Sequence, residues 1–139
     1  MNDSHDLRLI IESRIPVIVI ETWEEKRALT LLSKLGIQLG LPVFAWSITE
    51  GLRRSDYDQA ANQPLTAEPE AALKHIRSGK LAGIYTLCDI HPFLNDEPRI
   101  IRLIKDIALD AEETGQTLIL VSHAIDIPSE FKRHSALFN

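Results

Sequence analysis

The chain has 139 residues, of which 15 are lysine or arginine and 20 are aspartate or glutamate, so its formal net charge is −5. Its 45% share of hydrophobic residues is ordinary for one globular domain, and we expect a single domain over residues 1–139. A domain of this length buries about two-thirds of the surface that its unfolded chain exposes, enough for a core without metals or disulfides. Cys88 is the single cysteine, so an intrachain disulfide is excluded.

Three classes of protein do not fit this sequence. The first residues are polar and acidic, whereas a secretion signal begins with basic residues followed by an apolar stretch. Apolar runs such as residues 16–20 are far shorter than the roughly 18 residues of a membrane helix. The densest basic group is Arg53 with Arg54, too little for a nucleic-acid interface. We expect a cytoplasmic protein that neither inserts into a membrane nor binds nucleic acid.

Short apolar runs of strand length alternate with longer stretches of helical periodicity, which is typical of a parallel sheet covered by helices. Four runs are predicted strands because their valine, isoleucine and leucine content is nearly unbroken, as in strands buried on both faces. They are residues 16–21, 42–46, 82–89 and 117–122. The sequence therefore predicts a three-layer α/β domain with a four-stranded parallel sheet.

Apolar residues recur at helical spacing between these strands. The first helix is indicated by Leu7, Ile10 and Ile11, the second by Ala28, Leu31, Leu32, Leu35 and Leu39, and a later one by Ile100, Leu103, Ile104, Ile107, Ala108 and Ala111. Gly40, Gly79 and Gly115 stand just past helical stretches, where a left-handed cap favours glycine. Pro69 and Pro98 stand in first turns, where a missing N–H costs nothing.

Two segments fall outside this alternation. Residues 47–67 are irregular and polar, and we expect a mobile loop there. Residues 128–133 predict a helical turn, after which the apolar residues 136–138 are typical of the start of another element. We therefore expect this chain to be the front part of a longer protein.

Ligands of open parallel sheets bind where the strands end, so the residues after each predicted strand are candidates for function. The first strand leads into ETWEEK at residues 21–26, which has no glycine and begins its helix with two carboxylates. A phosphate loop needs glycines, a lysine and a serine or threonine here, and carboxylates would repel a phosphate. Thr22 and Glu25 instead match a capping box, which we predict closes the helix start.

Two other sites remain open at the strand ends. Glu21, Asp89 and Ser122 resemble the Mg²⁺ pocket, acceptor aspartate and hydroxyl residue of a phospho-receiver domain, although a second acid and a lysine of that pattern are absent. Asp89, His91 and His123 are weak candidates for a transition-metal site, without close His-x-x-His or Cys-x-x-Cys spacing. Hydrogen bonding of these histidines within turns is the simpler interpretation.

Cys88 lies inside an apolar predicted strand. A thiol there is ordinarily a small buried side chain with a raised pKa, so we do not expect it to be a nucleophile. The sequence has no G-x-S-x-G turn, and no hydrolytic triad is predicted.

Four segments together resemble one family: SRIPVIVIETWEE at residues 13–25, WSITEGLRR at 46–54, DIHPFL at 89–94 and LVSH at 120–123. The family is the AAA-domain ATPases of plastid genomes, cyanobacteria and other bacteria, catalogued as an uncharacterised chloroplast reading frame. The likeness covers nearly the whole chain and corresponds to the family's N-terminal portion. It implies a parent protein that binds ATP and Mg²⁺ in a separate AAA module, which this chain lacks.

The resemblance also implies that this portion is a truncated, degenerate phosphate-loop or AAA core with strand order 1-4-3-2, where a receiver domain has 2-1-3-4. On that mapping Asp89 ends a Walker B-like strand, Ile90 stands in place of the catalytic glutamate, and Ser122 falls at the sensor position. We therefore expect no catalytic residue and no cofactor in this chain.

The favoured function is a non-catalytic interaction or regulatory domain that contacts a protein partner or its own AAA module. Aromatic, histidine and arginine side chains near loop starts are the candidate contacts, namely Trp46, Arg53, Arg54, His91 and Phe93. The alternative is that Trp46 belongs to the core and the arginines only face solvent. An open sheet edge would also pair with a second copy and give a homo-oligomer. The rival function is a receiver-like phosphoryl or nucleotide domain built on the acidic pocket described above.

Overall fold

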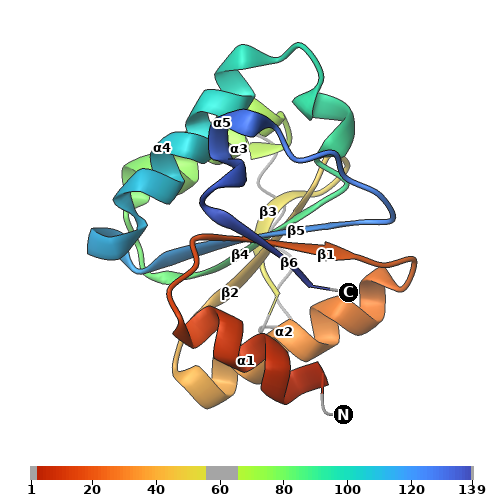
Figure 1. Ribbon diagram of the computed structural model, residues 1–139, viewed down its shortest axis with the longest axis vertical. Coiled ribbons are helices and arrows are strands. Elements are labelled where there is room, and N and C mark those ends of the chain that lie inside the picture. Colours follow the sequence, from red (N-terminus) through yellow and green to blue (C-terminus); the bar gives the residue numbers. More distant parts are fainter. Residues whose placement is uncertain (1–2, 56–65, 139) are drawn as a thin grey trace.

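The computed structural model describes residues 3–55 and 66–138, and a mixed β-sheet lies between two layers of helices (Figure 1). Its strands are β1 (Val17–Glu21), β2 (Val43–Ser47), β3 (Gly51–Arg54), β4 (Gly83–Cys88), β5 (Gln116–Ser122) and β6 (Ser135–Phe138). Their order across the sheet is β3-β2-β4-β5-β1-β6. β3 runs antiparallel to β2, whereas the other neighbours pair in parallel.

The prediction of a four-stranded parallel sheet is wrong in the number of strands and in the direction of one of them. The four predicted strands lie in the order β2-β4-β5-β1, the predicted 1-4-3-2 read from the other end, but one further strand extends each edge. β3 lies inside the stretch that we expected to be a loop, where two arginines in four residues hide the strand pattern. Residues 56–65 of that predicted loop lie outside the described residues. β6 pairs with β1 in parallel and extends the sheet beyond it.

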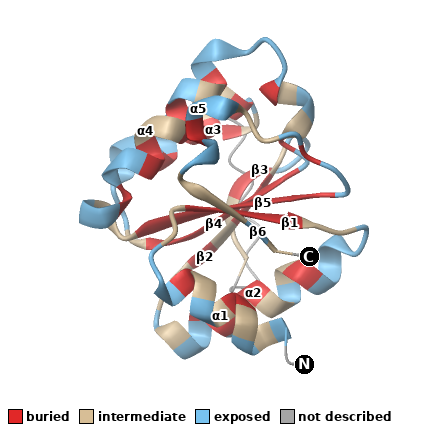
Figure 2. Cartoon of the chain, viewed as in Figure 1, coloured by how far each residue is buried: buried red, intermediate tan, exposed pale blue. Residues whose placement is uncertain are grey.

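Helices cover both faces of the sheet, as predicted for a three-layer domain. Figure 1 shows α1 (Asp3–Glu12) and α2 (Glu25–Leu39) on one face, and α3 (Pro69–Gly79), α4 (Pro98–Thr114) and α5 (Ser129–Lys132) on the other. The central strands are buried, and the helices bury the sides that face them (Figure 2). Within residues 3–55 and 66–138, no helix is long and apolar enough to cross a membrane.

The predicted helix punctuation is partly confirmed. Gly40 and Gly115 adopt the left-handed conformation at the ends of α2 and α4, with φ of 69° and 74°. Pro69 and Pro98 stand in first turns, as predicted. The prediction for Gly79 is wrong, because Gly79 is the last residue of α3 and Lys80, with φ of 51°, takes the left-handed position.

The predicted capping box at the start of α2 is wrong. The helix begins at Glu25, and its N-cap, Glu24, makes no side-chain cap hydrogen bond. The hydroxyl oxygen of Thr22 accepts the backbone N–H of Glu24 at 3.0 Å, a local turn two residues long. The threonine therefore shapes the turn that precedes the helix and does not cap the first N–H groups of α2.

Gly36 lies in α2 against β2, and we expect alanine there to destabilise the domain. A Cβ on Gly36 would overlap Cγ2 of Val43 and lie 2.8 Å from the carbonyl oxygen of Leu41. Overpacking of this kind costs about 1–3 kcal/mol, more than the roughly 0.5–1 kcal/mol that alanine gains over glycine in a helix. Gly79 is the matched control, because a Cβ there meets nothing within 4 Å. Urea unfolding should show Gly36→Ala less stable, and Gly79→Ala more stable, than the unchanged chain.

Thr86 carries a buried hydroxyl on β4, and we expect valine there to stabilise the domain. Its oxygen has no hydrogen-bond partner among the described residues, and the side chain is fully buried. Because valine has nearly the same shape without the polar group, Thr86→Val should raise the free energy of unfolding by about 1 kcal/mol. Thr86→Ser keeps the hydroxyl and loses the methyl, so it should lower stability. A valine variant that unfolds at lower urea concentration would contradict this account.

Candidate functional site at the carboxyl edge of the sheet

The carboxyl ends of the parallel strands β1, β2, β4 and β5 all lie along the same side of the sheet, which we call the carboxyl edge. This is where the sequence predicts the candidate site. Glu21 at the end of β1 stands directly opposite Ser122 at the end of β5. Asp89 follows β4 in a left-handed conformation, with φ of 56°. His91 begins the short 3-10 helix η2 (His91–Leu94) that comes next. The chain therefore presents three polar side chains and one histidine along a single edge.

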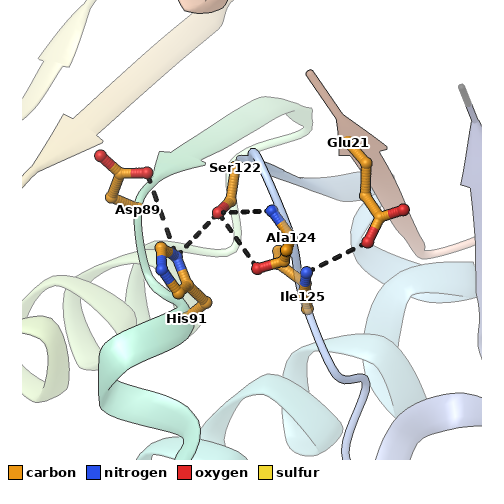
Figure 3. A network of polar contacts seen from close by, with 6 residues as sticks. All are labelled: Glu21, Asp89, His91, Ser122, Ala124 and Ile125. Carbon is orange, nitrogen blue, oxygen red and sulfur yellow. Dashed lines mark hydrogen bonds and ion pairs between the residues drawn. The ribbon is translucent and has the colours of Figure 1, made fainter. Parts of the chain in front are cut away.

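Ser122 and His91 form a direct contact in the centre of this edge (Figure 3). The hydroxyl oxygen of Ser122 lies 2.8 Å from Nδ1 of His91. It also donates to the carbonyl oxygen of Ala124 at 3.3 Å and accepts the N–H of the same residue at 3.4 Å. Ser122 is only 3% exposed. The serine therefore ties η2 to the segment after β5.

This contact is not a hydrolytic relay, although serine, histidine and aspartate meet here. Oδ1 of Asp89 lies 4.0 Å from Nδ1 of His91, the same nitrogen that contacts Ser122. In a catalytic triad the carboxylate and the nucleophile contact opposite nitrogens of the ring, so that a proton can pass between them. The arrangement positions the histidine, and it lacks the geometry of a catalytic triad.

Glu21 and Asp89 do not share a pocket. Oε2 of Glu21 accepts the backbone N–H of Ile125 at 3.1 Å, which fastens the segment after β5 to the end of β1. Figure 3 shows the two carboxylates on opposite sides of Ser122. The side chain of Asp89 is 64% exposed. The three residues proposed for a receiver-like Mg²⁺ pocket are thus neighbours that do not converge, and the strand order differs from the 2-1-3-4 of a receiver.

The histidines proposed as metal ligands make ring contacts. The rings of His91 and His123 meet edge to face with centroids 5.3 Å apart, and His123 stacks on Trp23 with centroids 4.4 Å apart and planes 17° from parallel. Among the residues that the structure describes, no group of three histidine, cysteine or carboxylate side chains is placed to hold a metal ion. Trp23 is 83% exposed, and sequence reasoning did not single it out. In the sequence this tryptophan stands among charged residues, a pattern that could have indicated an exposed aromatic side chain.

Trp46 is a core residue, which corrects its place among the candidate contacts. It is 1% exposed, and its indole N–H donates to the carbonyl oxygens of Thr66 and Ala67 at 2.9 and 3.1 Å. The ring of Phe93 packs edge to face against it at 6.3 Å between centroids. This tryptophan therefore fastens η2 and the residues before α3 to the sheet.

The two candidate arginines contact different groups. Arg53 pairs with Glu50 at 3.4 Å on the surface. The guanidinium of Arg54 lies 5.6 Å from the ring centroid of Phe44, which in turn stacks on Tyr85 at 4.8 Å. Arg54 thus packs on an aromatic stack beside β3, whereas Arg53 pairs with a surface carboxylate, and both arginines are half-buried.

Cys88 is unsuited to nucleophilic chemistry. Burial raises the pKa of its thiol to about 12, and the nearby carboxylates of Glu25 and Asp89 act in the same direction, against a small opposing effect of Arg53. The thiolate is the reactive form, so this cysteine is almost fully protonated at neutral pH.

We expect the Cys88 thiol to resist an aromatic disulfide reagent at pH 8 while the chain is folded and to react fully in denaturant. The folded pKa lies above the ordinary value of 9.0, so its contribution to stability is complete below pH 9 and is lost as the pH rises toward 12. Cys88→Ala lacks this group and should lose less stability above pH 9. Rapid labelling of the folded chain at pH 8 would refute the assignment.

Comparison with known proteins assigns the chain to a family. Residues 3–139 match the family described as SpoVK-like AAA ATPase, N-terminal domain. The chain belongs to this family. The resemblance inferred from the motifs is thereby confirmed. No solved structure matches the chain.

Relatives of this SpoVK-like N-terminal domain are uncharacterised AAA domain-containing proteins named ycf46. The chain is 30% identical over 131 residues to the protein of Pyropia yezoensis, covering 92% of this chain and 26% of that protein. It is 28% identical over 127 residues to that of Guillardia theta, with 88% and 24% covered, and 24% identical over 135 residues to that of Trieres chinensis, with 95% and 26% covered. The chain spans about a quarter of the length of these relatives.

Proposed function

We propose that this domain is a non-catalytic contact domain of an AAA-type ATPase, which binds a protein partner or its own AAA module and leaves ATP binding to that module. The observation that carries the proposal is the use of the polar groups at the carboxyl edge. The carboxylate of Glu21 and the hydroxyl of Ser122 both hold the segment after β5. Because these two groups already hydrogen-bond the backbone of the chain, they are not available to bind a ligand.

The turn between β1 and α2 does not fit the phosphates of ATP. It holds no glycine, and Glu24 and Glu25 stand at the helix start where a phosphate would bind. Their negative charge complements the helix dipole in place of a phosphate and would repel one. ATP and Mg²⁺ therefore belong, on this proposal, to the AAA module that the family name denotes.

The accessible side chains of the edge supply the contact surface. Arg53 is partly exposed, and His91 and Phe93 are half-buried. Trp23 protrudes and stacks on His123, which in turn contacts His91. An exposed tryptophan and an arginine are the side chains that most often dominate protein interfaces.

The first test is thermal unfolding of the chain with and without ATP and Mg²⁺. A ligand at about a hundred times its dissociation constant stabilises a domain by about 2.7 kcal/mol, which raises the melting temperature by several degrees at this size. We expect no shift, because the β1–α2 turn repels phosphate. A clear rise in melting temperature would overturn the non-catalytic assignment.

Mg²⁺ alone and Mg²⁺ with acetyl phosphate are the matched controls. The receiver-like alternative predicts a mass gain of one phosphoryl group on Asp89 with the second control, followed by loss of that gain in Asp89→Asn. We expect no mass gain, because the carboxylate of Glu21 is held by Ile125 on the other side of Ser122 from Asp89.

A further inference from the structure

Trp23 and His123 form a rigid aromatic projection, which we call the Trp23 knob. The two rings stack at 4.4 Å between centroids, and His91 supports His123 from the side at 5.3 Å. Trp23 is nevertheless 83% exposed, so one face of the indole and its outer edge are open to solvent. Stacking restricts the rotamers of both side chains, which lowers the entropy that binding would otherwise cost.

The surroundings of the Trp23 knob are negatively charged. The segments at residues 21–27, 88–91 and 122–126 contain five carboxylates and two cationic side chains. The carboxylates are Glu21, Glu24, Glu25, Asp89 and Asp126. A partner for this knob must therefore offer an apolar slot for an indole and a rim of positive charge.

The same chain carries a hollow with these properties between α3 and α4, which we call the α3–α4 groove. Its volume is about 320 Å³, and its lining includes the apolar side chains of Pro98 and Leu103. Lys74, Arg99 and Arg102 line it too, and all three are well exposed. The groove therefore combines apolar walls with exposed cationic side chains of the kind that pack over an aromatic ring.

Carboxylates within the α3–α4 groove do not cancel its positive charge. Glu70 lies 2.9 Å from Lys74 and 3.9 Å from Arg99. Asp106 lies 3.0 Å from Arg102 and 3.4 Å from Arg77. Each of these two carboxylates is thus shared by two cations, which leaves an excess of positive charge around the hollow.

We propose that the Trp23 knob of one copy of this domain docks into the α3–α4 groove of a second copy. The indole would lie against Pro98 and Leu103, and the guanidinium groups of Arg99 and Arg102 would cover its free face. Cation–π contacts with tryptophan are the strongest of their kind. The carboxylates beside the knob would face the cationic rim, so the contact is complementary in shape and in charge. This proposal names the partner of the contact domain and rests on that function.

The contact joins two different surfaces of the domain. The knob follows β1 and leads into α2, which covers the face of the sheet opposite to α3 and α4 (Figure 1). Each copy that uses its knob keeps a free groove, and each copy that uses its groove keeps a free knob. Such a head-to-tail contact extends beyond two copies unless the rotation closes a ring.

Complementation between two variants tests this geometry directly. Trp23→Ala removes the knob and keeps the groove, whereas Arg99→Glu with Arg102→Glu reverses the rim and keeps the knob. Sedimentation velocity at low ionic strength should show the unchanged chain associating beyond a dimer, and each variant alone at least tenfold weaker. An equimolar mixture of the two variants retains one intact contact, so it should form a 1:1 dimer and nothing larger.

Two matched variants control for the loss of a surface group. Ile37→Ala shortens another apolar side chain that is 75% exposed, and Lys34→Glu reverses another exposed charge, both on α2. Both should associate like the unchanged chain. Circular dichroism checks that every variant is folded before its association is compared.

Three results would overturn the proposal. They are an unchanged chain that stays monomeric up to about 1 mM, a Trp23→Ala variant that still associates, and a mixture that stays monomeric. Binding of a tetra-arginine peptide to a monomeric chain, lost in Trp23→Ala, would assign the knob to a basic protein partner instead. Each of these outcomes leaves the ATP melting result unchanged, so the contact partner and the non-catalytic role are tested separately.

Discussion

The position of β1 is the constraint on which the rest of this structure depends. β1 is hydrogen-bonded to β5 on one side and to β6 on the other, both in parallel, and its first four residues are buried. Parallel neighbours need crossover connections, so the helices between these strands must lie on the faces of the sheet. The carboxyl ends of β1 and β5 then coincide, and this brings the carboxylate of Glu21 within hydrogen-bonding distance of the backbone N–H of Ile125.

The sequence predicted those parts of the fold whose apolar residues follow a single clear pattern. The inner strands are continuous apolar runs, and α4 repeats its apolar residues at helical spacing, so both were found. β3 and β6 were missed because each is four residues long and gains its stability from a neighbour that is distant in sequence or lies across a turn. The capping box failed because Thr22 bonds the second residue after it, a choice of turn that a residue pattern does not specify.

The candidate site was predicted in its location and only partly in its use. The polar residues at the strand ends do gather on one edge, as the parallel sheet requires. Their partners were not predictable, since the bond from Ile125 to Glu21 joins residues far apart in the chain. The two tryptophans show the same limit. Trp46 ends one predicted strand and Trp23 closely follows another, yet Trp46 is buried against Phe93 whereas Trp23 is exposed and stacks on His123.

Because of this contrast, the two tryptophans can serve as two distinct fluorescence probes within one chain. Indole emission shifts to longer wavelength in water, so Trp23 and Trp46 emit in different parts of the spectrum while the domain is folded. The blue component reports the packing of the core beneath η2, and the red component reports events at the rim where Trp23 protrudes. Loss of the first marks unfolding, and quenching of the second alone marks a contact made by an intact domain.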